Sequence, residues 1–441
     1  MKRKRYAIVG TGGRADMYIA AIATTYKDVA ELVGFCDINP CRMAYYNNEL
    51  QTKAYGCHGA VPTYAPQDFD RMIAETKPDT VIVTVPDRLH HVYGCRAMEL
   101  GCDVISEKPM TTDFKKCQEI IDTQKRTNRK YTVTFNYRYS PRNSRVKELL
   151  QSGIAGKITS VHFEWLLDTS HGADYFRRWH RDKKNSGGLM IHKATHHFDL
   201  MNWWLDSEPE TVFGMGDLKF YGRCNAEERG MTNFYYRAKG CKEAENDPFA
   251  LHVSPGDRVD KLYYQAEHAD GYFRDLNPFS DGISIEDNMS VMVRYKNQAV
   301  MTYNLCAHCP WEGYRAVFNG TEGRLEFTVV EQGFTQANED MSVYGMREYA
   351  AGDTDRKKMV PEILFQKMWE KPEVFSYIEG NGGHGGGDEK LLDDIFLGVK
   401  DDPLGHAADF RDGAQSILIG IGANISFQTG EPVNVQNLIK L

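Results

Sequence analysis

Short apolar runs alternate with longer amphipathic stretches over the first 140 residues. The runs are rich in β-branched or aromatic residues and end in polar or glycine-containing turns, as buried strands do. We expect strands over residues 6–10, 31–37, 80–85, 103–106 and 131–136. The stretches between them have helical spacing, which predicts helices over residues 14–25, 66–76, 90–100 and 113–126. This alternation predicts an α/β domain, a doubly wound parallel sheet covered by helices on both faces.

The pattern changes after about residue 140. Several of the later apolar runs alternate with polar residues, and strands are expected over residues 158–165, 211–215, 290–295, 299–305, 315–319 and 323–329. Strands that follow a βα section favour an α+β domain with a large mixed or antiparallel sheet. We therefore divide the chain into domains at residues 1–139 and 140–441. Residues 216–286 are polar and too long for an ordinary loop, so we interpret them as an insertion, a cap over a pocket or an oligomer contact.

Composition excludes several classes of protein. The net charge of −8 argues against a nucleic-acid binder, and no apolar run is long enough to span a membrane. The apolar run after the basic start breaks after four residues, too early for a secretory signal, and the ten cysteines are scattered. We therefore expect a cytoplasmic enzyme with neither nucleic acid nor membrane as partner. The Cys306–Cys309 pair has CxxC spacing, which we interpret as structural.

A glycine-rich loop joins the first predicted strand to the first helix. It reads Gly10-Thr11-Gly12-Gly13-Arg14-Ala15, the G-x-G-x-x-A pattern of a dinucleotide-binding Rossmann domain. Gly10 permits the tight turn, Gly12 lets the backbone approach a pyrophosphate, and Ala15 lets the helix pack closely on the strand. We expect the loop, including Thr11, Gly13 and Arg14, to bind the cofactor phosphates on free helix N–H groups.

An acidic residue ends the second predicted strand. Asp37 lies 22 residues beyond Ala15, where a carboxylate can accept both ribose hydroxyls and repel a 2′-phosphate. This favours NAD, although the nearby Arg42 leaves NADP open. The alternative is that Asp37 only caps the next turn.

Two further strand ends carry candidate residues. Thr84, Pro86 and His90 follow the third strand, beside the expected nicotinamide ribose, although His90 could simply start a surface helix. The fourth strand delivers Glu107-Lys108-Pro109. A cis Lys–Pro bond would direct Lys108 inward as a fixed proton donor.

The segment 186–205 concentrates ionisable side chains. Helical spacing would place His192, His196 and Asp199 on one face, with Lys193 and His197 in the neighbouring stripe. Such a group in a cleft is typical of tuned pKa values. A zinc site on this face is a rival interpretation, but it needs another ligand and Lys193 would repel the cation, so we expect no metal. The remaining alternative is a helix packed at a domain boundary.

Taken together, these motifs resemble the Gfo/Idh/MocA oxidoreductases, which act mostly on sugars and cyclitols. The resemblance covers nearly the whole chain and rests on the glycine loop, residues 84–90, 107–109 and 135–141, and the His-x-x-Asp of residues 196–199. It implies that Lys108 lies near the nicotinamide, that His196 is the acid/base, and that Asn136 and Arg138 line the cleft. Many relatives carry an acid where this chain has His192.

The resemblance also implies where the substrate binds. Relatives often contact substrate just before the glycine pair, where this chain has Trp179 and His180. Trp179 would stack on a sugar ring, and the alternative is that it is a surface aromatic. His192 and Lys193 would hold a neighbouring hydroxyl, and Asp199 would orient the pocket.

The predicted reaction is reversible hydride transfer between NAD and a secondary hydroxyl of a sugar, glycoside or cyclitol. One alternative is an NAD-dependent glycosidase that works by transient oxidation, elimination, hydration and re-reduction, with His192 as the additional base. Another is a non-catalytic NAD-binding regulator. An exposed sheet in the second domain would suit a homodimer or homotetramer.

Overall fold

The computed structural model describes residues 2–335, 362–377, 380 and 383–441. Its first domain is a six-stranded parallel sheet in the order β3-β2-β1-β4-β5-β6. The strands are β1 Lys4–Val9, β2 Ala30–Cys36, β3 Thr63–Tyr64, β4 Thr80–Val83, β5 Asp103–Ser106 and β6 Tyr131–Val133. The doubly wound sheet predicted from the alternating pattern is confirmed. The two-residue β3 was not predicted, because so short a strand has no periodicity.

Helices connect these strands, as expected. They are α1 Ala15–Ala23, α2 Pro40–Leu50, α3 Phe69–Thr76, α4 His90–Glu99 and α5 Phe114–Thr127. Helix α2 was not predicted, although its start carries a recognisable signal. The Asn39 side chain accepts hydrogen bonds from the N–H groups of Cys41 and Arg42, and Pro40 occupies the first turn. This cap sets the position of Arg42 beside the end of β2.

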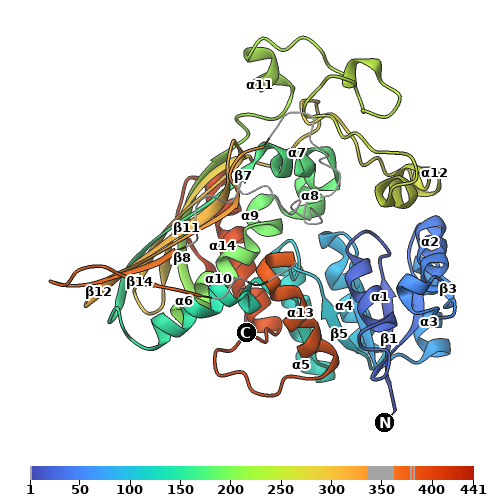
Figure 1. Ribbon diagram of the computed structural model, residues 1–441, viewed down its shortest axis with the longest axis horizontal. Helices are drawn as coiled ribbons and strands as arrows, with labels where there is room; N and C mark the ends of the chain where they lie inside the picture. Colours follow the sequence, from blue (N-terminus) through green and yellow to red (C-terminus); the bar gives the residue numbers. More distant parts are fainter. Residues whose placement is uncertain (1, 336–361, 378–379, 381–382) are drawn as a thin grey trace.

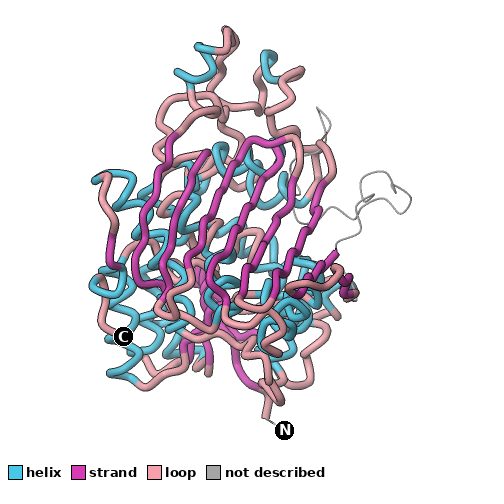
Figure 2. Tube along the Cα trace, turned by 90° about the vertical axis from the view of Figure 1, so that its left-hand side faces the viewer, coloured by secondary structure: helices cyan, strands magenta, loops and turns pink. Residues whose placement is uncertain are grey.

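The second domain is built on a nine-stranded sheet in the order β14-β13-β12-β11-β7-β10-β9-β8-β15. The strands are β7 Ile158–Asp168, β8 Pro209–Asp217, β9 Asn288–Tyr295, β10 Val300–Cys309, β11 Glu312–Gly320, β12 Gly323–Gln332, β13 Glu362–Lys367, β14 Glu373–Phe375 and β15 Val433–Asn434. Strands β7 and β10 are parallel and the other pairs are antiparallel, so the predicted mixed sheet is confirmed. Figure 2 shows that no helix among the described residues covers its outer face.

Helices pack on the inner face of this sheet, which Figure 1 shows edge-on at the left. They are α6 Pro141–Gln151, α7 Thr169–Arg177, α8 Lys183–Ser186, α9 Leu189–His192, α10 Thr195–Leu205 and α14 Phe410–Thr429. The His197 ring of α10 stacks on Trp165 of β7 with centroids 3.8 Å apart, and its Nδ1 lies 2.6 Å from the Tyr303 hydroxyl. His197 therefore belongs to the core. Within the described residues, no helix is long and apolar enough to cross a bilayer.

The prediction of a single helix over the histidine-rich segment is wrong. Helix α9 ends at His192 and α10 begins at Thr195, and between them the Ala194 N–H bonds the Leu189 carbonyl, five residues back. Since the helix is interrupted, His192 and His196 are not successive positions on one helical face. The break turns them toward different neighbours.

The C-terminal segment returns to the first domain. Helix α13, Gly383–Phe396, places the Phe396 ring 5.1 Å from that of Tyr6 and accepts a 2.9 Å hydrogen bond from Tyr26 to Asp393. This helix brings residues from the end of the chain to the junction of the two domains (Figure 1).

The predicted insertion forms an arm above the first domain. It contains α11 Arg223–Glu228, the short segments η6 Lys242–Ala244 and η7 Asp260–Tyr264, and α12 Glu267–Asp270. In Figure 1 it leaves the second domain near α7 and descends to α2. Its own buried core is small, with Tyr235, Ala244 and Ala250.

Candidate active site

The glycine loop lies against the end of β4. Gly10 has φ +90°, and a Cβ there would lie 2.7 Å from the backbone of Thr84, so only glycine fits. The Thr84 hydroxyl donates to the Gly10 carbonyl at 2.5 Å and so fixes the turn. The loop then opens α1 with Gly12 and Gly13, whose Cβ positions would have the Tyr263 hydroxyl as their neighbour. N–H groups at such a first turn suit phosphate oxygens, and here the Gly13 N–H donates to the Tyr263 hydroxyl at 2.8 Å.

Asp37 is held at the end of β2 by the loop itself. Its carboxylate accepts from the backbone and the hydroxyl of Thr11, the latter at 3.0 Å, and from the Asn39 N–H at 2.7 Å. Arg42 pairs with it at 3.5 Å and also with Asp270 of the insertion. Asp37 therefore both shapes the turn and faces the place predicted for a ribose, while Arg42 is shared by two carboxylates.

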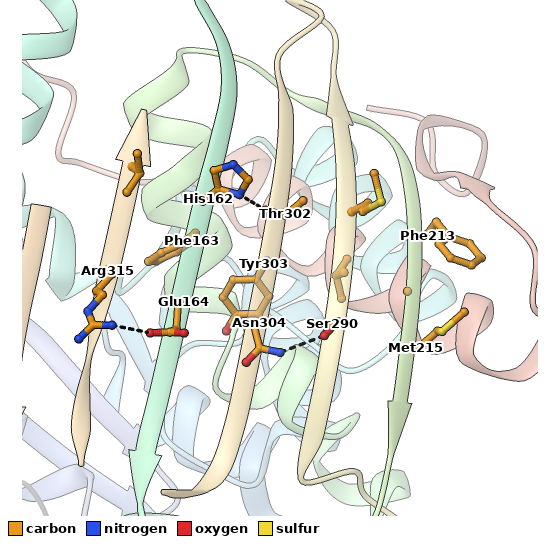
Figure 3. Close-up of a pocket in the computed structure, with 14 residues that line it drawn as sticks. His162, Phe163, Glu164, Phe213, Met215, Ser290, Thr302, Tyr303, Asn304 and Arg315 are labelled. Carbon is orange, nitrogen blue, oxygen red and sulfur yellow. Dashed lines mark hydrogen bonds and ion pairs between the residues drawn. The ribbon is translucent and has the colours of Figure 1, made fainter. Parts of the chain in front are cut away.

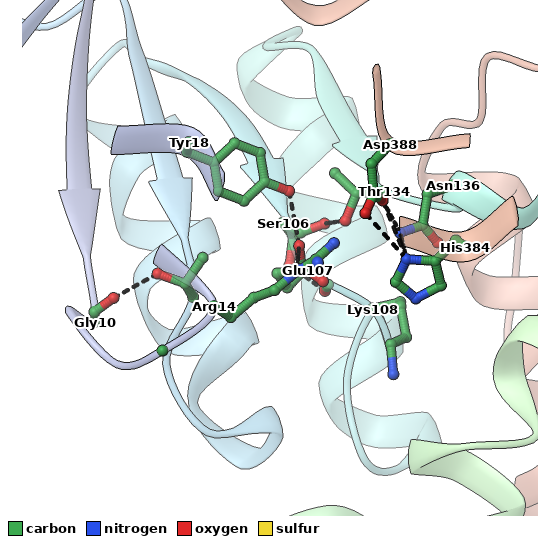
Figure 4. A network of polar contacts seen from close by, with 12 residues as sticks. Gly10, Arg14, Tyr18, Ser106, Glu107, Lys108, Thr134, Asn136, His384 and Asp388 are labelled. Carbon is green, nitrogen blue, oxygen red and sulfur yellow. Dashed lines mark hydrogen bonds and ion pairs between the residues drawn. The ribbon is translucent and has the colours of Figure 1, made fainter. Parts of the chain in front are cut away.

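Glu107 connects the glycine loop to the strand end that carries Lys108. Its carboxylate accepts from Arg14 Nε at 2.6 Å and from the Tyr18 hydroxyl at 2.7 Å, as Figure 4 shows. Burial acts to raise the pKa of Glu107, but Arg14 and Tyr18 outweigh it and lower the pKa. The Arg14–Glu107 ion pair fixes the glycine loop relative to the strand end that carries Lys108. Glu107 and Arg14 are thus positioned by each other.

His90 does not present a nitrogen to a ligand. Its Nδ1 lies 2.7 Å from the Pro109 carbonyl and its Nε2 2.9 Å from the Val85 carbonyl, and the ring is buried. His90 braces the loop that contains Pro86 against the loop that contains Lys108. The expected contact with the cofactor is corrected to this bracing role.

Lys108 extends from the first domain to the second. The Lys108–Pro109 bond is cis, and Nζ donates to the His192 carbonyl at 3.2 Å. Burial lowers the pKa of Lys108 to about 8, an effect that Asp87 opposes and Lys193 increases. The ammonium thus lies at the domain junction with its proton held less firmly than in water.

His192 pairs with an acid that sequence reasoning did not select. Its Nδ1 lies 2.6 Å from the Asp87 carboxylate, which is buried in the turn after β4. Burial, followed by the positive charges of Lys108 and Arg178, lowers the pKa of His192 well below its usual value. The available signal was the acid of the Thr-Val-Pro-Asp strand end, one residue beyond Pro86. The hydrogen bond to Nδ1 fixes the tautomer and leaves Nε2 as the nitrogen that can exchange a proton.

His196 lies in an aromatic enclosure. Its ring centroid is 5.1 Å from Tyr137 and 5.7 Å from His384, and the residue is 3% exposed. Its Nδ1 has no hydrogen-bond partner within the described chain. Burial, then the charge of Lys108, lowers the pKa of His196 well below its usual value, so the imidazole is neutral at neutral pH. A neutral imidazole can accept a proton.

Asn136 anchors α13 beside this enclosure. Its amide donates to Asp388 at 2.6 Å and lies 2.8 Å from His384 Nδ1, as Figure 4 shows. The Asp388 carboxylate therefore receives these two side chains. His384 therefore joins the site from the C-terminal segment, a residue that the sequence analysis did not place there.

Arg138 and Asp199 form a buried bidentate pair. Arg138 Nε and Nη2 lie 2.8 and 2.6 Å from the two Asp199 oxygens, and Asp412 accepts a further bond at 3.0 Å. Both partners of the bidentate pair are buried. The expected roles, Arg138 as cleft lining and Asp199 as pocket orientation, are corrected to a structural ion pair. Asp199 is likewise directed away from any metal site with His192 and His196.

Further polar and aromatic side chains of the second domain gather around His192 and Lys193. The Trp179 ring stacks on His180 at 3.7 Å, and His180 is 4.2 Å from His192. Lys193 Nζ lies 5.2 Å above the Trp165 ring.

A second histidine–carboxylate pair, which the sequence analysis did not identify, lies among these side chains. His171 Nδ1 is 2.8 Å from Glu312, and its Nε2 is 2.9 Å from the Tyr175 hydroxyl. Over the described ranges, no group of three or more histidine, cysteine, aspartate or glutamate side chains is arranged to hold a metal ion.

Comparison with known proteins agrees with this arrangement. The model of the Gfo/Idh/MocA oxidoreductase family described as an NAD-binding Rossmann fold matches residues 4–135, and the model of its C-terminal alpha/beta domain matches residues 147–435. YteT of Bacillus subtilis (strain 168), itself described only provisionally as an oxidoreductase, is 32% identical over 99% of both chains.

Two more distant similarities are informative. Glycosyl hydrolase family 109 protein 1 of Akkermansia muciniphila is 26% identical over 44% of this chain and 41% of its own. The structure of levoglucosan dehydrogenase with NADH and levoglucosan has the same fold, with a TM-score of 0.62 at 18% identity, covering 99% of this chain and all of that one.

Proposed function

The chain belongs to the Gfo/Idh/MocA oxidoreductase family, and on that premise we propose that it catalyses reversible NAD-dependent hydride transfer at a secondary hydroxyl of a sugar, glycoside or cyclitol. The observation that carries this proposal is the approach of Lys108 Nζ to the His192 carbonyl at 3.2 Å. It brings an ammonium of the dinucleotide domain to the histidine-rich segment of the other domain. A solved relative of the same fold is named for the oxidation of a sugar derivative.

The residues present fit a dinucleotide. Gly10, Gly12 and Gly13 leave room for phosphates at the start of α1, and Asp37 would bind the ribose hydroxyls. When bound, NAD supplies a hydride acceptor. We infer NAD over NADP, because Asp37 repels a 2′-phosphate and Arg42 is already paired with Asp37 and Asp270.

His196 and Lys108 supply the proton chemistry. In the oxidative direction the neutral His196 imidazole takes the proton of the substrate hydroxyl. The Lys108 ammonium donates a hydrogen bond to the same oxygen and stabilises its developing negative charge. Lys193, His180 and the Trp179 ring would bind neighbouring hydroxyls and the ring face. In the reverse direction the protonated His196 returns that proton to the carbonyl oxygen, while the Lys108 ammonium donates its hydrogen bond to the same oxygen.

One assay tests this proposal. The purified protein is incubated with NAD and a panel of sugars, cyclitols and aryl glycosides, and NADH absorbance is followed together with aglycone release. Stoichiometric NADH with at least one polyol supports the proposal. NADH formation with none of them, by a protein that binds NAD, would contradict it.

A second candidate function is NAD-dependent glycoside cleavage. The buried Asp87–His192 pair favours it, because elimination after transient oxidation needs a base beyond His196. The cycle ends with addition of water and return of the hydride, so NAD is regenerated. The partial similarity to a glycosyl hydrolase supports the same candidate. In the assay above it predicts aglycone release with no accumulated NADH.

We also infer that the protein forms a homodimer or homotetramer through the outer face of the nine-stranded sheet. Figure 3 shows this face, where Met215 and Met292 are 69% and 51% exposed beside Phe213. Exposed apolar side chains that lie together are a feature of protein–protein contact surfaces. Light scattering on the purified protein tests the inference, and a monomer at micromolar concentration would contradict it.

A further inference from the structure

Residues 256–275 of the insertion, here called the strap, lie on the glycine loop. The Gly13 N–H donates to the Tyr263 hydroxyl at 2.8 Å. Arg258 donates to the Gly13 carbonyl at 2.9 Å and pairs with Asp16 of α1 at 2.9 Å. A segment about 250 residues away in sequence thus occupies the hydrogen-bonding position of the first turn of α1.

The strap is anchored on the other side of the loop as well. Asn39 donates to the Ala266 carbonyl at 2.9 Å, and Arg42 of α2 pairs with Asp270. Figure 1 shows α12 of the strap next to α2, with the arm arching back to the second domain. The strap therefore spans the loop from α1 to α2.

Buried positive charge gathers where the strap meets the C-terminal end of α7. Arg274 is 8% exposed, its Cζ lies 5.2 Å from the Tyr263 ring centroid, and its Nε and Nη1 have no hydrogen-bond partner in the described structure. Nε of Arg178 is unpartnered in the same sense. Unpaired buried guanidinium donors are costly, so a group that accepts from them binds favourably.

Three guanidinium groups converge on one buried carboxylate at this place. Asp174 is the carboxylate shared by three guanidinium groups, with Arg178 at 2.7 Å, Arg274 at 3.5 Å and Arg177 at 3.7 Å. A ligand with negative charge would accept hydrogen bonds from the unpartnered nitrogens of Arg274 and Arg178. Tyr263 marks where such a ligand lies, because its hydroxyl takes the hydrogen bond that the Gly13 N–H offers to a phosphate in loops of this kind.

We propose that Tyr263 and Arg274 bind the pyrophosphate of the dinucleotide from above, and that the strap holds the bound cofactor so that it is released slowly. This inference rests on the proposed function, which requires NAD at the glycine loop. Tyr263 must leave Gly13 before a phosphate can take its place, so the strap opens for each exchange.

Release of NADH tests the proposal. Protein loaded with NADH is mixed with excess NAD in a stopped-flow instrument, and the decay of NADH fluorescence gives the release rate. The variants are Tyr263→Phe and Arg274→Gln, each checked for the wild-type melting temperature. The matched control is Arg223→Gln, which changes an exposed arginine of the same insertion that pairs with Glu227.

We expect both strap variants to release NADH at least tenfold faster than wild type, and the control to release it at the wild-type rate. Wild-type release from both variants would overturn the inference. So would an Arg274→Gln variant that keeps the wild-type release rate but loses affinity for glucuronate and not for glucose, because the arginine would then serve an anionic substrate. A wild-type protein that binds no NADH at all would instead overturn the proposed function, and with it this inference.

Discussion

The Asp87 carboxylate of the first domain and the His192 imidazole of the second lie 2.6 Å apart. Neither domain alone contains this pair, so its formation depends on the docking of α9 against the turn after β4. The same docking brings Lys108 Nζ to the His192 carbonyl. The site is therefore assembled at the junction of the two domains. Its proton chemistry depends on residues from both of them.

The pair gives a first prediction, for His192→Asn. Asparagine keeps a polar side chain but cannot act as a base, so under the main proposal substrate preference changes while hydride transfer stays within about tenfold of wild type. Transfer of deuteride from labelled substrate to NAD is the measurement. Loss of aryl glycoside cleavage with intact deuteride transfer would instead support the second candidate function.

The pH profile gives a second prediction. The pKa of Lys108 is lowered to about 8, so the ammonium that stabilises the substrate oxygen is present below that pH and lost above it. We expect kcat/KM for oxidation to fall as pH rises through about 8. In Lys108→Arg, whose guanidinium keeps its charge, this decrease should disappear from the range up to pH 10 even if the rate is lower. An unchanged decrease in the variant would assign the titration to another group.

Cofactor choice gives a third prediction. Asp37→Ala removes the carboxylate that would accept the ribose hydroxyls and leaves Arg42 with Asp270 as its remaining acidic partner. We expect the Kd for NAD to rise at least tenfold, about 1.4 kcal/mol, with a smaller change for NADP. Titration calorimetry with both dinucleotides measures this. An unchanged ratio of the two Kd values would remove Asp37 from the ribose site.

The buried ion pair gives a fourth prediction. Asp199→Ala leaves the Arg138 guanidinium buried with Asp412 as its remaining carboxylate. Breaking such a pair from one side costs about 3 kcal/mol of unfolding free energy. Urea unfolding at neutral pH should show this loss. A variant with wild-type stability but without activity would contradict this prediction. It would support the role in orienting the pocket that the family resemblance implied for Asp199.

The sequence was most informative where local pattern and local chemistry coincide. The strand predicted over residues 103–106 has the same ends in the structure, because the apolar run is bounded by polar residues on both sides. The glycine loop was equally predictable, since local steric requirements determine which residue types can occupy it. Helix α2 was missed because its tyrosines and asparagines weaken the apolar period that marks a helix.

Long-range pairing was not predictable in the same way. Arg138 and Asp199 meet across 61 residues, and His-x-x-Asp spacing does not tell which way Asp199 points. The break between α9 and α10 was also not predicted, although Gly187 and Gly188, with φ of +72° and +82°, precede α9. The contact of Tyr263 with Gly13 leaves no trace in either local sequence.

The rate of hydride transfer in Lys108→Ala tests the central claim most directly. In a single turnover with saturating NAD and substrate, we expect the rate to fall at least a hundredfold, the typical contribution of a positioned proton donor, while the Kd for NAD changes less than threefold. A variant that transfers hydride at the wild-type rate would contradict the account, because the ammonium at the domain junction would then have no part in the chemistry.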